Sequence, residues 1–102
     1  MTIPSLDATG KVVVVTGGSK GLGRAMALGF AEAGADVVVA SRKLGPCEEV
    51  ATEVRALGRQ ALAVRCHVGD WDDCAALVDA TLATFGRIDV LVNNAGIAPV
   101  PP

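Results

Sequence analysis

The chain has 102 residues, of which 51% are apolar and 20% are charged. This composition can bury an apolar core and excludes a disordered segment, while the length allows no more than one domain. The net charge is −2, and no stretch holds a dense basic run. The chain also has one Trp, two Phe and no Tyr, so it offers few aromatic rings for stacking on bases. We therefore expect no nucleic-acid partner.

The cysteines and the amino-terminal segment bear on localisation. Cys47, Cys66 and Cys74 are scattered without a CxxC pair, and the chain has a single His. Such thiols are typical of a reducing compartment and do not indicate a zinc site. Pro4 and Asp7 lie where a signal peptide would carry basic charge and then an apolar run, and no run is long enough to span a bilayer. We expect a cytoplasmic protein with no membrane partner and no metal.

Short apolar runs without polar alternation alternate with segments of helical spacing. Such runs suit strands that are buried on both faces of a parallel sheet. In chain order we expect a strand at Val12–Thr16, a helix at 24–33, a strand at 37–40, a helix with an apolar face of Cys47, Val50, Ala51, Val54 and Leu57, a strand at 61–66, a helix with an apolar face of Cys74, Leu77, Val78, Leu82 and Phe85, and a strand at 88–92.

The expected helices carry end signals. Pro46 fits a first helical position, and Asp70 fits an N-cap. Glycines that fit helix stops follow the three helices: Gly34, Gly58 and Gly86.

This alternation predicts an α/β fold with a doubly wound, Rossmann-like parallel sheet, of which the chain holds the first βαβαβαβ portion, with strand order 3-2-1-4. The strand at 88–92 would then be an open apolar edge, which invites pairing with another strand. We therefore expect residues 1–102 to be the N-terminal part of one longer domain. The alternative is a stand-alone, non-catalytic nucleotide-binding or interaction module that pairs through this edge.

A glycine-rich loop follows the first expected strand and leads into the first helix. Its glycines, Gly17, Gly21 and Gly23, have the spacing G-x3-G-x-G. Small residues allow a tight turn and close backbone approach, and a helix N-terminus presents free N–H groups to a pyrophosphate. Glycine also serves ordinary tight turns, but the position between a buried strand and a helix favours a dinucleotide site.

The second expected strand is followed by basic residues where an NAD site would carry an acid. The segment 40–43 reads Ala-Ser-Arg-Lys, and Arg42 lies 19 positions after Gly23, close to the offset of about 20 residues for the ribose-binding residue. A guanidinium there can bind a 2′-phosphate, which favours NADP(H) over NAD(H). The alternative is a solvated turn with ordinary surface charge. We expect four basic side chains around this spot: Lys20, Arg24, Arg42 and Lys43. Of these, Arg24 can point away, because it lies on the first helix.

The ends of the third and fourth expected strands supply further candidates. His67 and Val68 are expected to border an adenine ring, because they follow a strand that neighbours the loop. The fourth strand ends in Asn93, Asn94, Ala95 and Gly96, which fit either a turn near the cofactor ribose or a purely structural turn.

Taken together, residues 16–23 and 89–96 resemble the short-chain dehydrogenase/reductase family. The resemblance implies an oxidoreductase that moves hydride between a nicotinamide cofactor and a carbonyl or alcohol substrate, and a homo-oligomer. It also implies three groups of cofactor-binding residues: a pyrophosphate loop of Gly17, Ser19, Lys20, Gly21 and Leu22, a 2′-phosphate site of Ser41 and Arg42, and a ribose-facing turn of Asn94, Ala95 and Gly96.

Two departures from the family pattern limit what can be transferred. Family members use a Tyr, a Lys four positions later, a Ser and an Asn for catalysis, all beyond the Asn-Asn-Ala-Gly turn, whereas this chain has no Tyr and no Lys after Lys43. We therefore expect no catalytic residue here and no activity from this chain alone. Many relatives also have an Asp that binds the adenine amino group, where this chain has His67.

Overall fold

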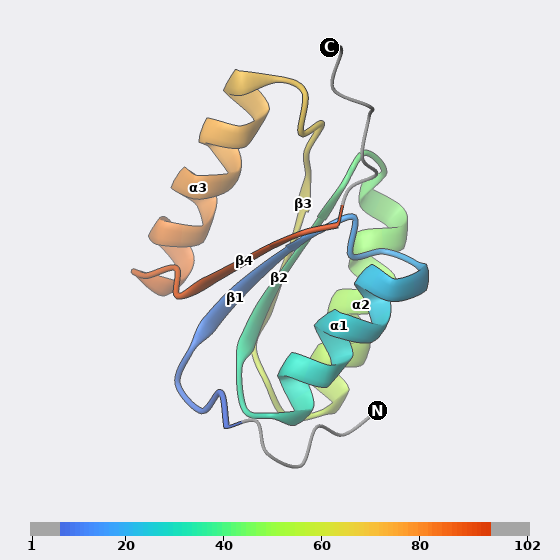
Figure 1. Ribbon diagram of the computed structural model, residues 1–102, viewed down its shortest axis with the longest axis vertical. Helices are drawn as coiled ribbons and strands as arrows, with labels where there is room; N and C mark the ends of the chain where they lie inside the picture. The colour runs from blue at the N-terminus through green and yellow to red at the C-terminus, as the bar shows by residue number, and fades with distance from the viewer. Residues whose placement is uncertain (1–6, 95–102) are drawn as a thin grey trace, which may run out of the picture.

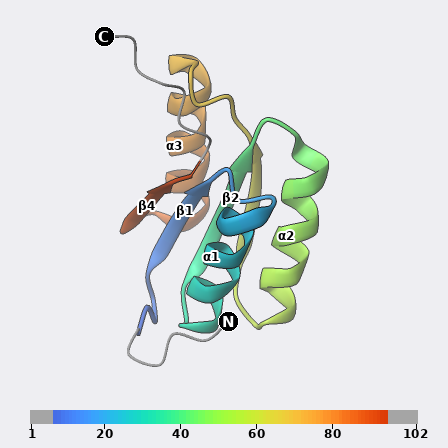
Figure 2. The same ribbon diagram turned by 45° about the vertical axis from the view of Figure 1, so that its right-hand side comes forward.

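The computed structural model describes residues 7–94, which form seven alternating strands and helices. The four strands make one parallel sheet in the order β3-β2-β1-β4, as predicted. Helices α1 and α2 cover one face of the sheet and α3 lies on the other (Figures 1 and 2). The elements are β1 (Val12–Thr16), α1 (Gly21–Glu32), β2 (Asp36–Ser41), α2 (Leu44–Ala56), β3 (Ala61–Arg65), α3 (Trp71–Phe85) and β4 (Val90–Asn93).

The alternating side chains of the strands build a separate apolar cluster on each face. On the α1 and α2 face, Val13 and Val15 of β1 pack with Val50 and Val54 of α2. On the α3 face, the intervening residues of β1 pack with Leu77. All five residues of β1 are buried, because the strand lies inside the sheet and both of its faces are covered.

Several element ends differ from the prediction. Helix α1 begins at Gly21 rather than at residue 24, and β4 spans Val90–Asn93 rather than 88–92. Strand β3 ends at Arg65, although the N–H of Cys66 still donates to the Ser41 carbonyl at 2.8 Å. The prediction for Pro46 is wrong by two positions, since α2 begins at Leu44. Proline is tolerated there because the N–H groups of a first helical turn have no partner within the helix.

The predicted start of α3 is confirmed. The Asp70 carboxylate accepts hydrogen bonds from the N–H groups of Asp72 at 2.8 Å and Asp73 at 3.2 Å. The helix ends at Gly86, whose φ of 76° is a left-handed conformation that favours glycine. Asp70 thus satisfies the amide groups that begin α3, and they are engaged within the protein.

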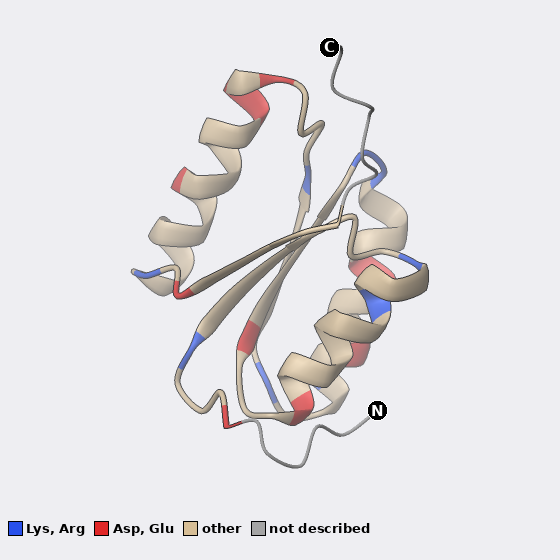
Figure 3. Ribbon diagram, viewed as in Figure 1, with Lys and Arg blue, Asp and Glu red and all other residues tan. Residues whose placement is uncertain are grey.

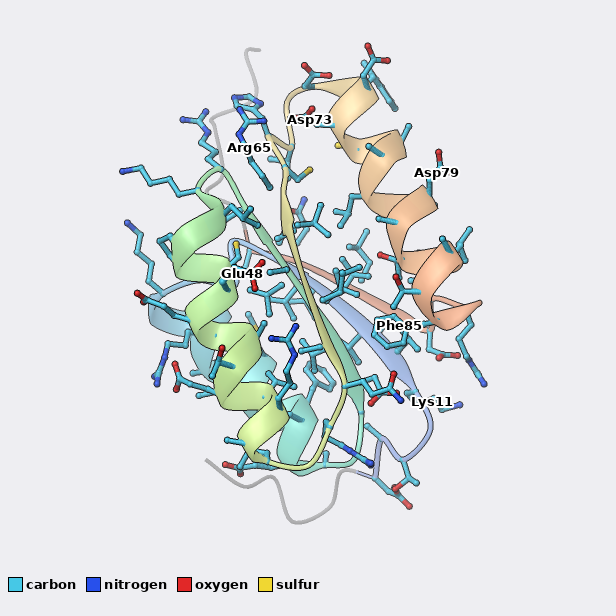
Figure 4. The ribbon with its side chains drawn as sticks, turned by 180° about the vertical axis from the view of Figure 1, so that it is seen from behind. Lys11, Glu48, Arg65, Asp73, Asp79 and Phe85 are labelled. Atoms are coloured by element: carbon cyan, nitrogen blue, oxygen red, sulfur yellow. The ribbon has the colours of Figure 1, made fainter. Side chains whose placement is uncertain are left out.

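Strand β4 is an edge of the sheet and is more exposed than β1. Leu91 of β4 is 63% exposed, and the facing helix α3 leaves Val78 and Leu82 exposed, although both were predicted on its apolar face. Leu57 is also exposed because α2 ends before it. An apolar pocket of about 200 Å³ lies between α3, β1 and β4. Figure 4 shows Phe85 directed from α3 toward the sheet on this side.

A carboxylate just before β4 ties this edge to the centre of the sheet. Asp89 Oδ2 accepts the N–H of Val12 at 2.8 Å, and the N–H of Asp89 donates to the Val12 carbonyl at 2.9 Å. Arg87 Nη2 donates to Asp89 Oδ1 at 2.6 Å. The Arg87 guanidinium, together with the Val12 N–H, holds the pKa of Asp89 below its ordinary value of 3.8.

We predict that Asp89→Ala lowers the melting temperature at pH 7, because the variant loses both hydrogen bonds of the carboxylate. A carboxylate whose pKa is lowered by folding stabilises the protein above its unfolded pKa, and this stabilisation is lost as the pH falls through the folded value. Thermal unfolding followed by circular dichroism should therefore show a full difference from wild type at pH 7 and 5 that shrinks below pH 3.8. The matched control is Asp79→Ala, which removes an exposed carboxylate from α3. A difference that is independent of pH, or equal to that of the control, would contradict this role.

Candidate functional site

A cleft of about 1080 Å³ lies at the edge of the sheet where the parallel strands end. Residues from the connections after all four strands meet there, since the carboxyl ends of parallel strands share one edge. Among the described residues that line it, none is an Asp or a Glu. The lining residues are Gly17, Ser19, Lys20, Ser41, Arg42, Lys43, Pro46, Cys66, His67, Val68, Gly69, Asn93 and Asn94.

The glycine-rich loop makes its turn through very close backbone contacts. Gly17 has a φ of 65°, and its N–H donates to the Ala40 carbonyl of β2 at 2.8 Å. A Cβ at Gly23 would lie 2.0 Å from the carbonyl oxygen of Gly17 and 2.8 Å from Asn94 Nδ2. Only glycine therefore allows the first turn of α1 to pack against both the loop and the end of β4.

Two of the three helices begin at this cleft without a side-chain cap. The N-cap residues of α1 and α2 are Lys20 and Lys43, and neither side chain accepts a hydrogen bond from the helix. Lysine is a donor only, so it cannot satisfy the first amide groups of a helix. Helix α3 differs, because Asp70 caps it. The starts of α1 and α2 are therefore suited to an anionic ligand.

Three of the four expected basic residues meet at the cleft. Lys20, Arg42 and Lys43 line it, and in the described part of the chain no carboxylate forms an ion pair with any of them. The prediction for Arg24 is wrong: its Nε donates to Glu53 Oε1 of α2 at 3.1 Å, and Nη2 contacts the other carboxylate oxygen. Figure 3 shows basic residues at the starts of α1 and α2.

Ser41 lies at the cleft, and its hydroxyl is engaged within the turn. The hydroxyl donates to the Lys43 carbonyl at 3.2 Å and lies 3.0 Å from Cys47 Sγ. Burial raises the pKa of the Cys47 thiol, which therefore stays neutral. Ser41 thus holds the segment that presents Arg42.

His67 and Val68 lie where β3 leaves the sheet. Arg42 Nη2 and His67 Nε2 are 2.7 Å apart, which joins the ends of β2 and β3. Burial raises the pKa of the neighbouring Cys66 thiol to about 11. Within residues 7–94, no group of three or more His, Cys, Asp or Glu side chains is placed to hold a metal ion.

The end of β4 is fastened to the end of β1. The Thr16 hydroxyl lies 2.9 Å from Asn93 Oδ1, and the N–H of Asn94 donates to the Thr16 carbonyl at 3.1 Å. Asn94 is thereby held beside Gly23, as the close approach of its side chain indicates. Ala95 and Gly96, which were predicted to continue this turn, lie outside the described residues.

The sequence prediction did not include every residue that lines the cleft after the strand ends. Cleft residues that it missed are Pro46, Cys66 and Gly69. Each is a close sequence neighbour of a predicted site residue, and the shared edge of a parallel sheet is the signal that would have included them. Three predicted loop residues do not line the cleft but belong to the first turn of α1 beside it: Gly21, Leu22 and Gly23.

Comparisons with known proteins agree with this arrangement. The family model described as short chain dehydrogenase matches residues 11–102. The chain is 46% identical over 100 residues to 11-beta-hydroxysteroid dehydrogenase A of Sesamum indicum, covering 97% of this chain and 29% of that protein. It is 45% identical over 91 residues to L-rhamnose 1-dehydrogenase (NAD(P)(+)) of Sphingomonas sp. (strain SKA58), covering 88% of this chain and 36% of that protein.

Solved structures give the same result. A crystal structure of hydroxysteroid dehydrogenase from Escherichia coli superposes with a TM-score of 0.86 at 38% identity, covering 89% of this chain and 39% of that one. A short-chain type dehydrogenase/reductase from Mycobacterium marinum gives a TM-score of 0.86 at 41% identity, over 93% and 37% of the two chains. The chain thus spans about a third of the length of its relatives. None of the helices that the structure describes is long and apolar enough to cross a membrane.

The contact between Gly23 and Gly17 supports a stability prediction. We expect Gly23→Ala to lower the free energy of unfolding by about 1–3 kcal/mol, because the new methyl group meets backbone that cannot rotate away. Urea denaturation of both proteins measures this difference.

The matched control is Gly45→Ala in α2, where a new Cβ meets no atom within 4 Å other than those of its chain neighbours. Alanine favours a helix, but a Cβ before Pro46 is disfavoured in the helical conformation, so we expect a change of less than about 1 kcal/mol in either direction. Equal effects of the two substitutions would refute the packing argument.

Proposed function

Because the chain belongs to the short-chain dehydrogenase family, we propose that residues 1–102 form the N-terminal, cofactor-binding part of one Rossmann-like domain in an NADP(H)-dependent oxidoreductase. The observation that carries this proposal is the acid-free cleft at the ends of the parallel strands, with two uncapped helix starts and three basic side chains around it. The relatives are dehydrogenases, which does not favour a stand-alone interaction module.

The start of α1 would hold the cofactor pyrophosphate. Its free amide groups and the positive end of its dipole face the loop of Gly17, Ser19 and Lys20, and the contact of Gly23 with the loop keeps the backbone compact. The same reasoning assigns roles to Gly21 and Leu22, whose amide groups begin the helix.

The start of α2 would hold the 2′-phosphate that distinguishes NADP from NAD. Arg42 can donate two parallel hydrogen bonds to phosphate oxygens, and Lys43 adds a second positive charge. Ser41 would act by holding this turn. Because no carboxylate lines the cleft, the described residues include none that would hold the ribose 2′-hydroxyl of NAD in the usual way.

The other strand ends complete the proposed site. His67 and Val68 would border the adenine ring, and Asn94, Ala95 and Gly96 would face the cofactor ribose. When bound, the nicotinamide would donate a hydride to a carbonyl carbon of a small-molecule substrate or accept one from an alcohol carbon. Because the chain has no Tyr and no Lys after Lys43, we propose that it binds cofactor without turnover. A purified chain that oxidises NADPH with a carbonyl substrate would refute this.

Two further proposals concern the whole protein. We propose a homo-oligomer, because membership of the short-chain dehydrogenase family implies one. We propose a cytoplasmic location, because Cys47, Cys66 and Cys74 are free thiols in the structure.

The cofactor preference is tested by Arg42→Ala. We expect binding of NADPH to weaken about 10- to 150-fold, the value of losing hydrogen bonds between charged groups, while binding of NADH changes by less than about twofold. Isothermal titration calorimetry with both cofactors gives the two ratios.

The matched control is Arg24→Ala, which removes the same charge from α1. Since Arg24 pairs with Glu53 and does not line the cleft, we expect the ratio of the NADPH and NADH affinities to be unchanged. Equal weakening of both cofactors by Arg42→Ala would exclude recognition of the 2′-phosphate by this residue.

A further inference from the structure

The guanidinium of Arg42 contacts a histidine rather than a carboxylate. Arg42 Nη2 and His67 Nε2 lie 2.7 Å apart, and both side chains line the cleft together with Lys43. The two residues come from the ends of adjacent strands, β2 and β3, whose last paired residues are Ser41 and Arg65. The contact is therefore built into the register of the sheet.

The second nitrogen of the His67 ring is also engaged. The N–H of Gly69 donates to His67 Nδ1 at 3.0 Å. A neutral imidazole has one acceptor nitrogen, so the bond from Gly69 places the ring proton on Nε2. That N–H then faces Arg42, which can only donate. The other tautomer accepts from Arg42 but turns a ring N–H toward the amide of Gly69, so either neutral tautomer opposes two donors.

An anionic oxygen is the group that satisfies both donors. Hydrogen bonds between charged nitrogens and oxygens are about 2.7–2.9 Å long, so one oxygen can bind both Nη2 and Nε2 when these nitrogens are 2.7 Å apart. We propose that His67 is a second specificity-determining residue for the 2′-phosphate: its Nε2–H donates to a phosphate oxygen beside Arg42, while Nδ1 keeps the hydrogen bond from Gly69. This inference rests on the NADP(H) function proposed above and extends it to a residue of β3.

The carboxylates near His67 are engaged in other contacts. From α3, Asp73 Oδ2 accepts the backbone N–H of His67 at 3.0 Å and lies 3.8 Å from Arg65 Nη1, and Asp70 caps the helix. Figure 4 shows Arg65 and Asp73 at the same end of the molecule.

Neither acid lines the cleft, and the neighbouring Cys66 thiol is neutral because its pKa is about 11. The charged side chains that share the cleft with the ring are all cations: Lys20, Arg42 and Lys43. A phosphate dianion would offset this positive charge and accept the Nε2–H of the neutral ring.

The test compares two probes that differ by the 2′-phosphate alone, adenosine 2′,5′-bisphosphate and adenosine 5′-monophosphate. Their binding to the 102-residue chain is measured by isothermal titration calorimetry at pH 8, where both probes carry phosphate dianions. For wild type we expect the bisphosphate to bind at least about tenfold more tightly than the monophosphate, because only its 2′-phosphate would reach Arg42 and His67.

For His67→Leu we expect binding of the bisphosphate to weaken about tenfold and binding of the monophosphate to change by less than about twofold, because the variant removes the ring N–H donor. His67→Gln keeps an N–H donor and should recover part of this loss. The control Arg65→Gln removes a cation beside His67 that does not line the cleft, and it should leave the ratio of the two affinities unchanged.

Two results would overturn the role of His67: equal weakening of both probes by His67→Leu, which would place the ring against adenosine, or an unchanged affinity of that variant for the bisphosphate. Arg42→Ala separates this inference from the function on which it rests. If Arg42→Ala abolishes the preference for the bisphosphate and His67→Leu leaves it unchanged, only the role of His67 fails. If neither substitution changes the preference, the NADP(H) proposal fails with it.

Discussion

The structure depends on the parallel pairing of β1 with a strand on each side. Val13 pairs with Val37 of β2 and with Val90 of β4, and all of β1 is buried. Since neighbouring strands run in the same direction and in register, the connections that leave them emerge at one edge (Figure 1). The Asp89 carboxylate holds the start of this register through the Val12 N–H. The cleft is therefore a consequence of strand pairing, which brings together polar residues from segments that are far apart in the sequence.

The three helices differ in whether a side chain satisfies their first amide groups. Asp70 caps α3, so the first amides of that helix are used within the fold. Helices α1 and α2 begin after lysines, which cannot accept hydrogen bonds from amides. An uncapped helix start costs stability unless water or a ligand satisfies it. Two such starts beside a cleft that no described acid lines fit the two phosphate sites proposed above.

The sequence allowed the strand order and the loop to be predicted because both follow from local signals. Buried β-branched runs, glycine spacing and the Asp70 cap each depend on a few adjacent residues. Contacts between distant side chains were not predictable in this way. Arg24 was expected at the phosphate site, but α2 presents Glu53 to it. The contact between Arg42 and His67 likewise depends on the register of β2 and β3, which periodicity alone does not specify.

The proposed recognition divides into two parts with different tolerance to change. The loop would hold the pyrophosphate through backbone groups, which are the same for NAD and NADP, and its geometry depends on the absence of a Cβ at Gly23. Discrimination would depend on side chains of the β2 and β3 ends, which can be exchanged without altering the backbone. Arg42 Nη2 and His67 Nε2 lie 2.7 Å apart and would donate to the same phosphate oxygen, so a change in either residue would remove one of the two donors. The net charge of −2 does not oppose an anionic ligand, because no acid reaches the cleft and the acidic residues lie elsewhere (Figure 3).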